Sequence, residues 1–245
     1  VLALQKRAVE GVPCDPAARR LLVDLLLFSG QLDDATEHLG HIRADDPEWP
    51  EAERSLHRLI RSERLRTLDG REPVISPEPA AEHAVRRRKA LKLLRRAEPA
   101  RATRAVDAAD LVTPVARGFI DGREFEGLRD ADDRFASVLE AFRGGEYLWV
   151  PWEALRKVRL APAEALLDQL YRPAALTFRD GSTTDVHLPL VYPASYRAEG
   201  AFALGIETDH VCPDNGPTRC LGAKLLLVND DDEMMLSECR LIEVR

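Results

Sequence analysis

Residues 13–47 read PCDPAARRLLVDLLLFSGQLDDATEHLGHIRADDP, and apolar residues recur within this stretch at helical spacing. Prolines at its two ends stand 34 residues apart, and two apolar positions recur downstream at the same offset. The three pairs are Pro13/Pro47, Leu22/Leu56 and Leu26/Ile60. Gly30 allows a tight turn between two helical segments, and Ala35 lets the second helix approach the first closely. Pro47 ends the second helix.

A helix–turn–helix unit with a period of about 34 residues is typical of tetratricopeptide repeats. Such repeats stack into a curved surface that holds a segment of another protein. The spacing therefore predicts a binding protein rather than an enzyme. Val1–Glu10 has the pattern of the second helix of a repeat, so we expect residues before Val1 to be missing.

Composition limits the class of protein. The chain has 245 residues, a hydrophobic fraction of 45% and a net charge of −7, which argues against general nucleic-acid binding. Its four cysteines form no Cys-x-x-Cys motif, so we expect reduced thiols and a cytoplasmic location. The sequence contains no run of 18 apolar residues, so no membrane span is expected. Residues 54–104 contain 15 basic and 6 acidic residues, so a basic stripe is expected there.

Two parts are expected, with a boundary near residue 112. Residues 1–112 predict a tetratricopeptide-like α–α superhelix of roughly three repeats, the last irregular. Its expected helices are 1–10, 16–29, 33–43, 51–68, 80–96 and 99–109. Residues 113–245 predict a mainly antiparallel α+β domain, because Asp-Gly turns stand between short apolar runs. The fold class is thus α+β.

Within the second part, the spacing of Phe135, Val138, Leu139 and Phe142 predicts a helix over 134–142. A short helix is expected over 163–170. A hairpin turn is expected at 118–122, with 125–128 as its return strand. The other expected strands and hairpin arms are 146–150, 154–160, 175–178, 184–190, 225–228, 234–236 and 239–244. Asp230–Glu233 predicts a charged hairpin tip.

Six phrases of the second part occur in one order. They are Phe119-Ile-Asp-Gly-Arg-Glu-Phe, Asp130-Ala-Asp-Asp-Arg-Phe, Leu139-Glu-Ala-Phe, Gly145-Glu-Tyr-Leu-Trp-Val-Pro-Trp-Glu, Tyr171-Arg-Pro-Ala and Val191-Tyr-Pro-Ala-Ser. With these phrases and its helical repeats, the chain resembles the ImpE/SciE (TagJ) family over most of its length. These are accessory proteins of bacterial type VI secretion. The chain departs from the family after Glu207-Thr-Asp, where His210 replaces a usual Trp.

The resemblance implies a non-enzymatic protein that binds the N-terminal helix of the small contractile-sheath subunit. It also implies a link to the AAA+ ATPase that disassembles the contracted sheath. No catalytic residue, cofactor or metal comes with the family. Two alternatives from other classes stay open. One is a general adaptor for another helix, and the other is an enzyme with its site in the second part.

The predicted binding face is the concave side of the repeats. It comprises Arg20, Asp24, Leu27 and Phe28 on the first helix of the clearest repeat and, 34 residues on, Arg54, Arg58, Arg61 and Ser62. An arginine-rich groove with an apolar floor suits a partner helix with acidic flanks. The alternative is that these arginines are ordinary solvated helix surface.

Other clusters have simpler interpretations than a site. The basic run 86–96 interleaves with apolar residues, which favours a solvated or intramolecular role over nucleic-acid binding. Asp132 or Asp133 is expected to cap a helix, and Asp130 could otherwise join them as a metal ligand.

His210, Cys212 and Cys220 do not have the spacing of a zinc finger, so no metal is expected. Phe142, Tyr147, Trp149 and Trp152 predict an aromatic core, with an exposed docking patch as the alternative.

Overall fold

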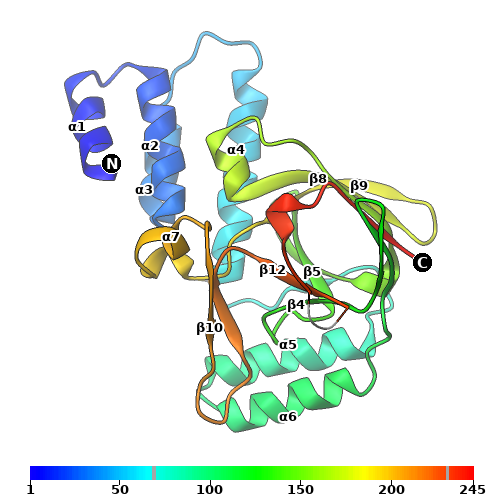
Figure 1. Cartoon of the computed structure of the whole chain (residues 1–245). Coiled ribbons are helices and arrows are strands. Elements are labelled where there is room, and N and C mark those ends of the chain that lie inside the picture. Colours follow the sequence, from blue (N-terminus) through cyan, green and yellow to red (C-terminus); the bar gives the residue numbers. More distant parts are fainter. Residues whose placement is uncertain (68–69, 230–231) are drawn as a thin grey trace.

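The computed structural model describes residues 1–67, 70–229 and 232–245. It places a helical bundle and a helix pair at opposite ends of a curled sheet (Figure 1). The bundle comprises α1 (Leu2–Gly11), α2 (Pro16–Phe28), α3 (Leu32–Gly40) and α4 (Trp49–Thr67). The helix pair comprises α5 (Glu82–Arg95) and α6 (Pro99–Asp110). A short α7 (Gly200–Ala203) lies beside the bundle.

The predicted helix–turn–helix unit is present as α2 and α3. The Asp15 carboxylate caps α2 by accepting from the backbone N–H of Ala17 at 2.9 Å, and Pro16 occupies the first helical position. Gly30 takes a φ of +66° after α2. A Cβ there would lie 2.7 Å from the Tyr196 ring, so only glycine fits this turn.

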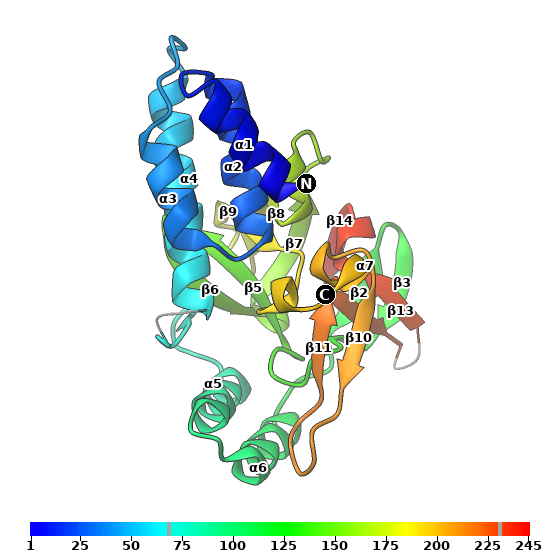
Figure 2. The same cartoon turned by 90° about the vertical axis from the view of Figure 1, so that its left-hand side faces the viewer.

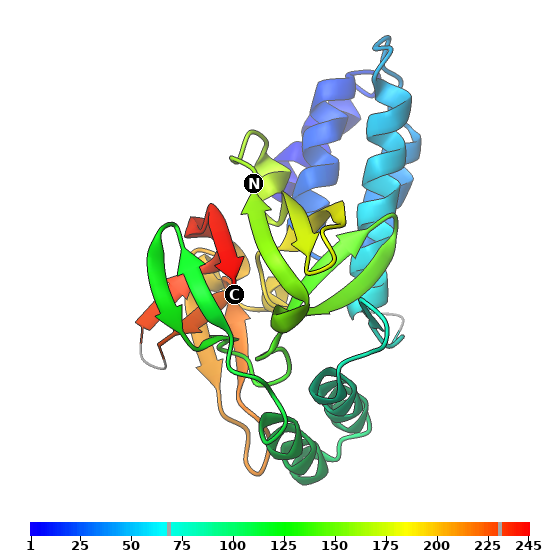
Figure 3. The same ribbon diagram turned by 90° about the vertical axis from the view of Figure 1, so that its right-hand side faces the viewer.

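The helical stack stops at α4. The sequence predicted an irregular third repeat, but α5 and α6 lie at the other end of the molecule from α1–α3 (Figures 1 and 3). They form a separate small core of Ala90, Leu93, Ala102 and Val106. Between α4 and α5, β1 (Val74–Ile75) pairs in parallel with β6 (Glu146–Pro151), and this pairing takes the chain away from the stack.

The strands form three sheets. A nine-stranded sheet has the order β1-β6-β5-β9-β8-β7-β14-β2-β3, and all its pairs except β1–β6 are antiparallel. A second sheet has the order β13-β12-β4, and β10–β11 is a hairpin. Beyond β1, the strand bounds are β2 (Arg117–Ile120), β3 (Arg123–Glu126), β4 (Leu128–Asp130), β5 (Val138–Arg143), β6 (Glu146–Pro151), β7 (Leu155–Leu160), β8 (Tyr171–Phe178), β9 (Thr183–Pro189), β10 (Thr208–Val211), β11 (Arg219–Gly222), β12 (Leu225–Val228), β13 (Asp232–Met235) and β14 (Leu241–Val244).

The β10–β11 hairpin extends down beside α6 (Figure 2). The Thr103 hydroxyl on α6 donates to the Asn215 carbonyl in the hairpin loop at 3.0 Å. The hairpin therefore ties the helix pair to the sheet region. The predicted fold class is confirmed: a helical part precedes a mainly antiparallel α+β part.

The helix predicted over 134–142 was wrong, because residues 134–137 form a turn and β5 begins at Val138. Val138 and Phe142 face the core shared with α4, whereas Leu139 and Ala141 face the core inside the curled sheet. Because both faces of β5 are buried, apolar residues occupy both faces of the strand on either side of Glu140, and this pattern also fits helical spacing. The β5–β6 turn at Gly144 and Gly145 places the strands side by side.

A second correction concerns residues 163–170, which were expected to form a helix. They contain only a 3₁₀ turn, Leu166–Gln169. The Asp168 carboxylate accepts from the backbone N–H groups of Glu164 and Ala165, and this fixes a local turn instead. Strands β1, β4, β10 and β11 were not predicted. Of the expected charged tip Asp230–Glu233, residues 230–231 lie outside the described part of the chain.

One core joins the bundle to the sheet. Leu56 and Ile60 of α4 share it with Phe142, Tyr147 and Trp149 of β5 and β6. Figure 3 shows α4 standing along this β5–β6 hairpin. The boundary at residue 112 stays a prediction, and the described elements on its two sides pack together through this core. Within the described residues, none of the helices combines the length and apolar content that a bilayer span requires.

Gly118 on β2 gives a test of the close approach of β14. A Cβ at Gly118 would lie 1.8 Å from the Glu243 carbonyl oxygen. We expect Gly118→Ala to push β14 from β2 and lower the free energy of unfolding by about 1–3 kcal/mol. Urea denaturation measures this change. Gly11→Ala is the matched control, because open space surrounds that position; equal stability of the two variants would contradict the expected clash.

Candidate functional site

A groove of about 730 Å³ lies between α4 and the sheet. Ser55, Arg58, Leu59 and Ser62 line its helical wall, and their spacing places them on one face of α4. The opposite wall comes from β7, β8, β9 and the β5–β6 turn. Its lining residues are Phe142, Arg143, Gly144, Gly145, Arg159, Leu160, Ala161, Pro162, Pro173, Ala174, Ala175, Asp185, Val186, His187, Arg240 and Leu241.

The groove has an apolar floor and a basic rim. Four arginines line it: Arg58, Arg143, Arg159 and Arg240. Asp185 is the one acidic residue among the described lining residues. Arg58 and Arg54 both contact the exposed Glu51 carboxylate, at 3.2 and 2.7 Å. Exposed pairs of this kind contribute little to stability, so Arg58 is free to exchange Glu51 for a partner's carboxylate.

The residues predicted as a binding face separate into two groups. Arg58 and Ser62 line the groove, and Arg54 and Arg61 lie on the exposed side of the same helix. The Arg61 side chain also approaches Gly145, with its Cδ 3.2 Å from where a Cβ would stand.

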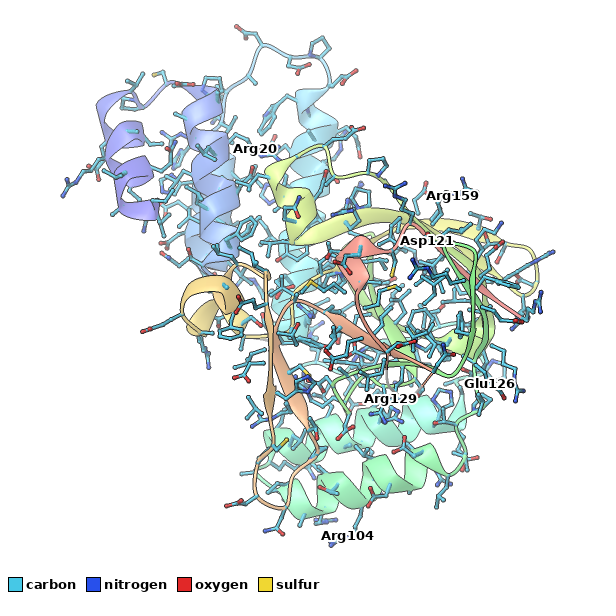
Figure 4. The ribbon with its side chains drawn as sticks, in the orientation of Figure 1. Arg20, Arg104, Asp121, Glu126, Arg129 and Arg159 are labelled. Atoms are coloured by element: carbon cyan, nitrogen blue, oxygen red, sulfur yellow. The ribbon has the colours of Figure 1, made fainter. Side chains whose placement is uncertain are left out.

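The four predicted residues on α2 lie outside the groove lining. Asp24 and Leu27 are buried, Phe28 is half-buried, and Arg20 pairs with Asp24 at 3.1 Å. Figure 4 shows Arg20 on the bundle, apart from Arg159 on the sheet. The full predicted set stays a prediction as a binding face.

Arg143, Arg159 and Arg240 were not predicted as part of a site. They come from distant positions in the sequence, and only the strand order brings them together. The Gly144-Gly145 turn was a local signal that β5 would end beside a hairpin, but it did not show which helix would face it.

A buried charge network holds α4 against the sheet. Arg66, near the end of α4, donates from Nε to Glu140 Oε1 at 2.9 Å and from Nη2 to Glu140 Oε2 at 3.1 Å. Its Nη2 also donates to the Val191 carbonyl at 2.8 Å. Arg66 and Glu140 are 6% and 1% exposed, so this two-pronged pair is made away from water.

Lys224 extends the network on the sheet side. Its Nζ lies 2.8 Å from Glu140 and 2.7 Å from Asp130. The Tyr192 hydroxyl donates to the other Asp130 oxygen at 2.6 Å. Both Asp130 oxygens thus have internal partners, and its carboxylate serves as the counter-charge of a buried lysine.

The expected helix cap at Asp132 or Asp133 was wrong, because a turn and then β5 follow these residues. Asp132 instead accepts from the backbone of Cys220 at 2.9 Å and pairs with Arg134. Asp133 pairs with Arg129 and accepts from the backbone of Thr218 at 2.7 Å. Both carboxylates therefore attach the turn to β11 and the chain before it.

Comparisons with known proteins agree with this architecture. The family model described as ImpE protein matches residues 122–243. The type VI secretion system accessory component TagJ of Pseudomonas aeruginosa is 32% identical over 214 residues, which cover 84% of this chain and 74% of that protein. The chain belongs to the ImpE/TagJ family of type VI secretion accessory components.

The same fold is present in a crystal structure of a Vibrio parahaemolyticus protein. The TM-score is 0.89 at 22% sequence identity, and the match covers all of this chain and 92% of that one. At this identity the likeness concerns the fold alone.

In this ImpE/TagJ family member, the basic run 86–96 is largely bound to the chain itself. Arg87 is buried, donates to Ser137 Oγ at 2.9 Å and pairs with Asp110. Arg88 and Lys92 both pair with Glu72. The intramolecular interpretation is thus confirmed for these three residues.

The aromatic cluster is core, as expected. Phe142, Tyr147, Trp149 and Trp152 are all buried. The thiol of Cys220 is also buried and lies 3.7 Å from His210 Nδ1, whereas Cys212 is exposed. Burial raises the pKa of Cys220 to about 12, so the thiol is protonated at neutral pH.

The charge network should make the stability of the family member depend on pH through Glu140. Burial alone raises the pKa of Glu140, but Arg66 and Lys224 outweigh it and hold that pKa well below the ordinary 4.5. A carboxylate whose pKa is lower in the folded than in the unfolded state stabilises the protein at pH values above the unfolded-state pKa. This stabilisation is lost as the pH falls towards the folded-state pKa.

We therefore expect Glu140→Gln to lower the free energy of unfolding by about 3 kcal/mol at pH 7, because it removes the negative charge that balances two buried cations. Below pH 4.5 the difference in the free energy of unfolding between wild type and variant should narrow by about 1.4 kcal/mol per pH unit. Urea denaturation from pH 3 to pH 7 measures the gap. Glu146→Gln is the control, since Glu146 pairs with Arg143 at the surface; a gap independent of pH would contradict the assignment.

Proposed function

We propose that this chain is a non-enzymatic, cytoplasmic binding protein of type VI secretion that holds the N-terminal helix of the small contractile-sheath subunit. The observation that carries the proposal is the groove between α4 and the sheet. Its floor is apolar, and its described rim carries four arginines against one aspartate. An amphipathic helix that presents apolar anchors and acidic flanks complements both features.

The two features contribute differently to binding. A partner's apolar side chains packed against Pro162, Pro173 and Ala175, apolar lining residues that stay accessible, would supply most of the affinity, as anchors in a desolvated centre do. Arginines at the rim would set the orientation of the bound helix and speed its association. The helix would therefore lie along α4 with its acidic residues toward Arg58 and Arg159.

The family resemblance also supports a role in sheath disassembly through the AAA+ ATPase. In this proposal the chain presents the captured sheath subunit to the ATPase. Co-purification of all three proteins, and its loss when the sheath helix is deleted, tests this link.

Reversing the charge of the groove rim should weaken sheath-helix binding. We expect Arg58→Glu combined with Arg159→Glu to raise the Kd for a peptide of the sheath subunit's N-terminal helix by about a hundredfold, because two rim charges then repel its acidic flanks. Isothermal titration calorimetry measures the change, and circular dichroism checks that the variant is folded.

Arg101→Glu combined with Arg104→Glu is the matched control. Both arginines are exposed on α6, and Figure 4 shows Arg104 at the opposite end of the molecule from Arg159. It makes the same change in net charge, so similar weakening by both double variants, or no weakening by the first, would overturn the groove as the binding site.

A further inference from the structure

A second hollow, of about 250 Å³, lies beyond the last turn of α4. It shares no lining residue with the groove described above. Five arginines line it: Arg66, Arg95, Arg134, Arg197 and Arg219. Carboxylates are absent from its lining within the described residues.

Two of the five arginines pair with carboxylates that do not line the hollow. Arg66 pairs with Glu140, and Arg134 pairs with Asp132 through both of that carboxylate's oxygens. These pairs belong to the buried network and fix the two guanidinium groups in place. They form a rigid basic floor.

The other three arginines have no carboxylate partner among residues 1–67, 70–229 and 232–245. Arg95 donates to the backbone carbonyls of Gly70 and Arg71, and Arg197 lies over the Tyr196 ring at 5.5 Å. Both side chains belong to exposed residues at the rim. Three positive charges therefore converge on one small space without a balancing charge on the described protein.

Arg219 carries a donor group that the described part of the chain leaves unsatisfied. Its Nε is buried and has no hydrogen-bond partner in the described structure. A buried donor without an acceptor costs free energy, and such groups are rare in folded proteins. Arg219 also lines the hollow, so an anion bound there would lie beside a guanidinium group whose Nε has no acceptor in the described structure.

We propose that this hollow binds a small phosphate-bearing molecule. A phosphate ester carries about −1.5 to −2 charges at pH 7, which suits three cations without a carboxylate partner among the described residues better than a single carboxylate does. Arginine forks match the oxygens of a phosphate group. The volume corresponds to about eight water molecules, so it admits an organic group as well as the phosphate. Leu91, Leu94 and Tyr196 offer that group an apolar wall.

Isothermal titration calorimetry of the full chain tests the proposal, with inorganic phosphate and glycerol 3-phosphate as separate probes at constant ionic strength. We expect saturable 1:1 binding of at least one probe, and tighter binding of the ester would place the organic group in the hollow too. Arg219→Gln should weaken this binding by about tenfold or more, because a charge-assisted hydrogen bond is lost.

Arg197→Gln is the second variant, since its exposed side chain can be changed without touching the core. It too should weaken phosphate binding, even if Arg219→Gln proves unstable. Arg104→Gln is the control for general attraction to basic residues, because it lines a different basic cleft between α5 and α6. Failure of both probes to bind wild type, or equal weakening by Arg104→Gln and Arg197→Gln, would overturn the site.

Discussion

The buried pair between Arg66 and Glu140 is the constraint on which the two hollows depend. An apolar contact between α4 and the sheet would tolerate a slide along the helix axis, since hydrophobic attraction has no direction. A guanidinium that donates two bonds to one carboxylate tolerates no such slide, because displaced charges would remain buried and unpaired. The pair therefore fixes which turns of α4 face β5. Ser55–Ser62 then form the groove wall, and Arg66 forms the floor of the second hollow.

Strand β5 makes this arrangement possible because it separates two cores. Glu140 projects on the same side as Val138 and Phe142, toward α4, while its neighbours Leu139 and Ala141 pack inside the curled sheet. A carboxylate in the middle of a strand buried on both faces requires hydrogen-bond donors and a counter-charge. The Tyr147 hydroxyl of the neighbouring strand β6 donates to it, and the cations come from outside the nine-stranded sheet. Arg66 comes from the bundle and Lys224 from the chain before β12. Glu140 therefore joins β5 to both of these segments.

Local signals in the sequence predicted most of the elements, and long-range geometry accounts for what they missed. The helical spacing within residues 13–47 and the Asp-Gly turns rely on near neighbours, and they correctly indicated α2–α3 and the main hairpins. The helix over 134–142 failed because two-sided burial removes the alternation that marks a strand. The groove was only partly foreseen. Arg58 could be found by repeat spacing, but Arg159 and Arg240 meet it through strand order, which spacing does not encode.

The basic stripe over residues 54–104 shows why a count of charges does not locate a site. Its arginines reach three different environments, although they look equivalent in the sequence. Arg87 is buried and satisfied by Ser137 and Asp110, Arg66 is buried and paired with Glu140, and Arg58 is exposed beside an apolar groove. The position of the carboxylates decides which arginine stabilises the fold and which stays at the surface, and the two that pair with the buried Arg66 and Arg87 across the fold, Glu140 and Asp110, come from later in the chain. The cations that line the two hollows therefore come from both the helices and the sheet region, with Arg58 and Arg95 on helices and Arg159 and Arg219 on strands.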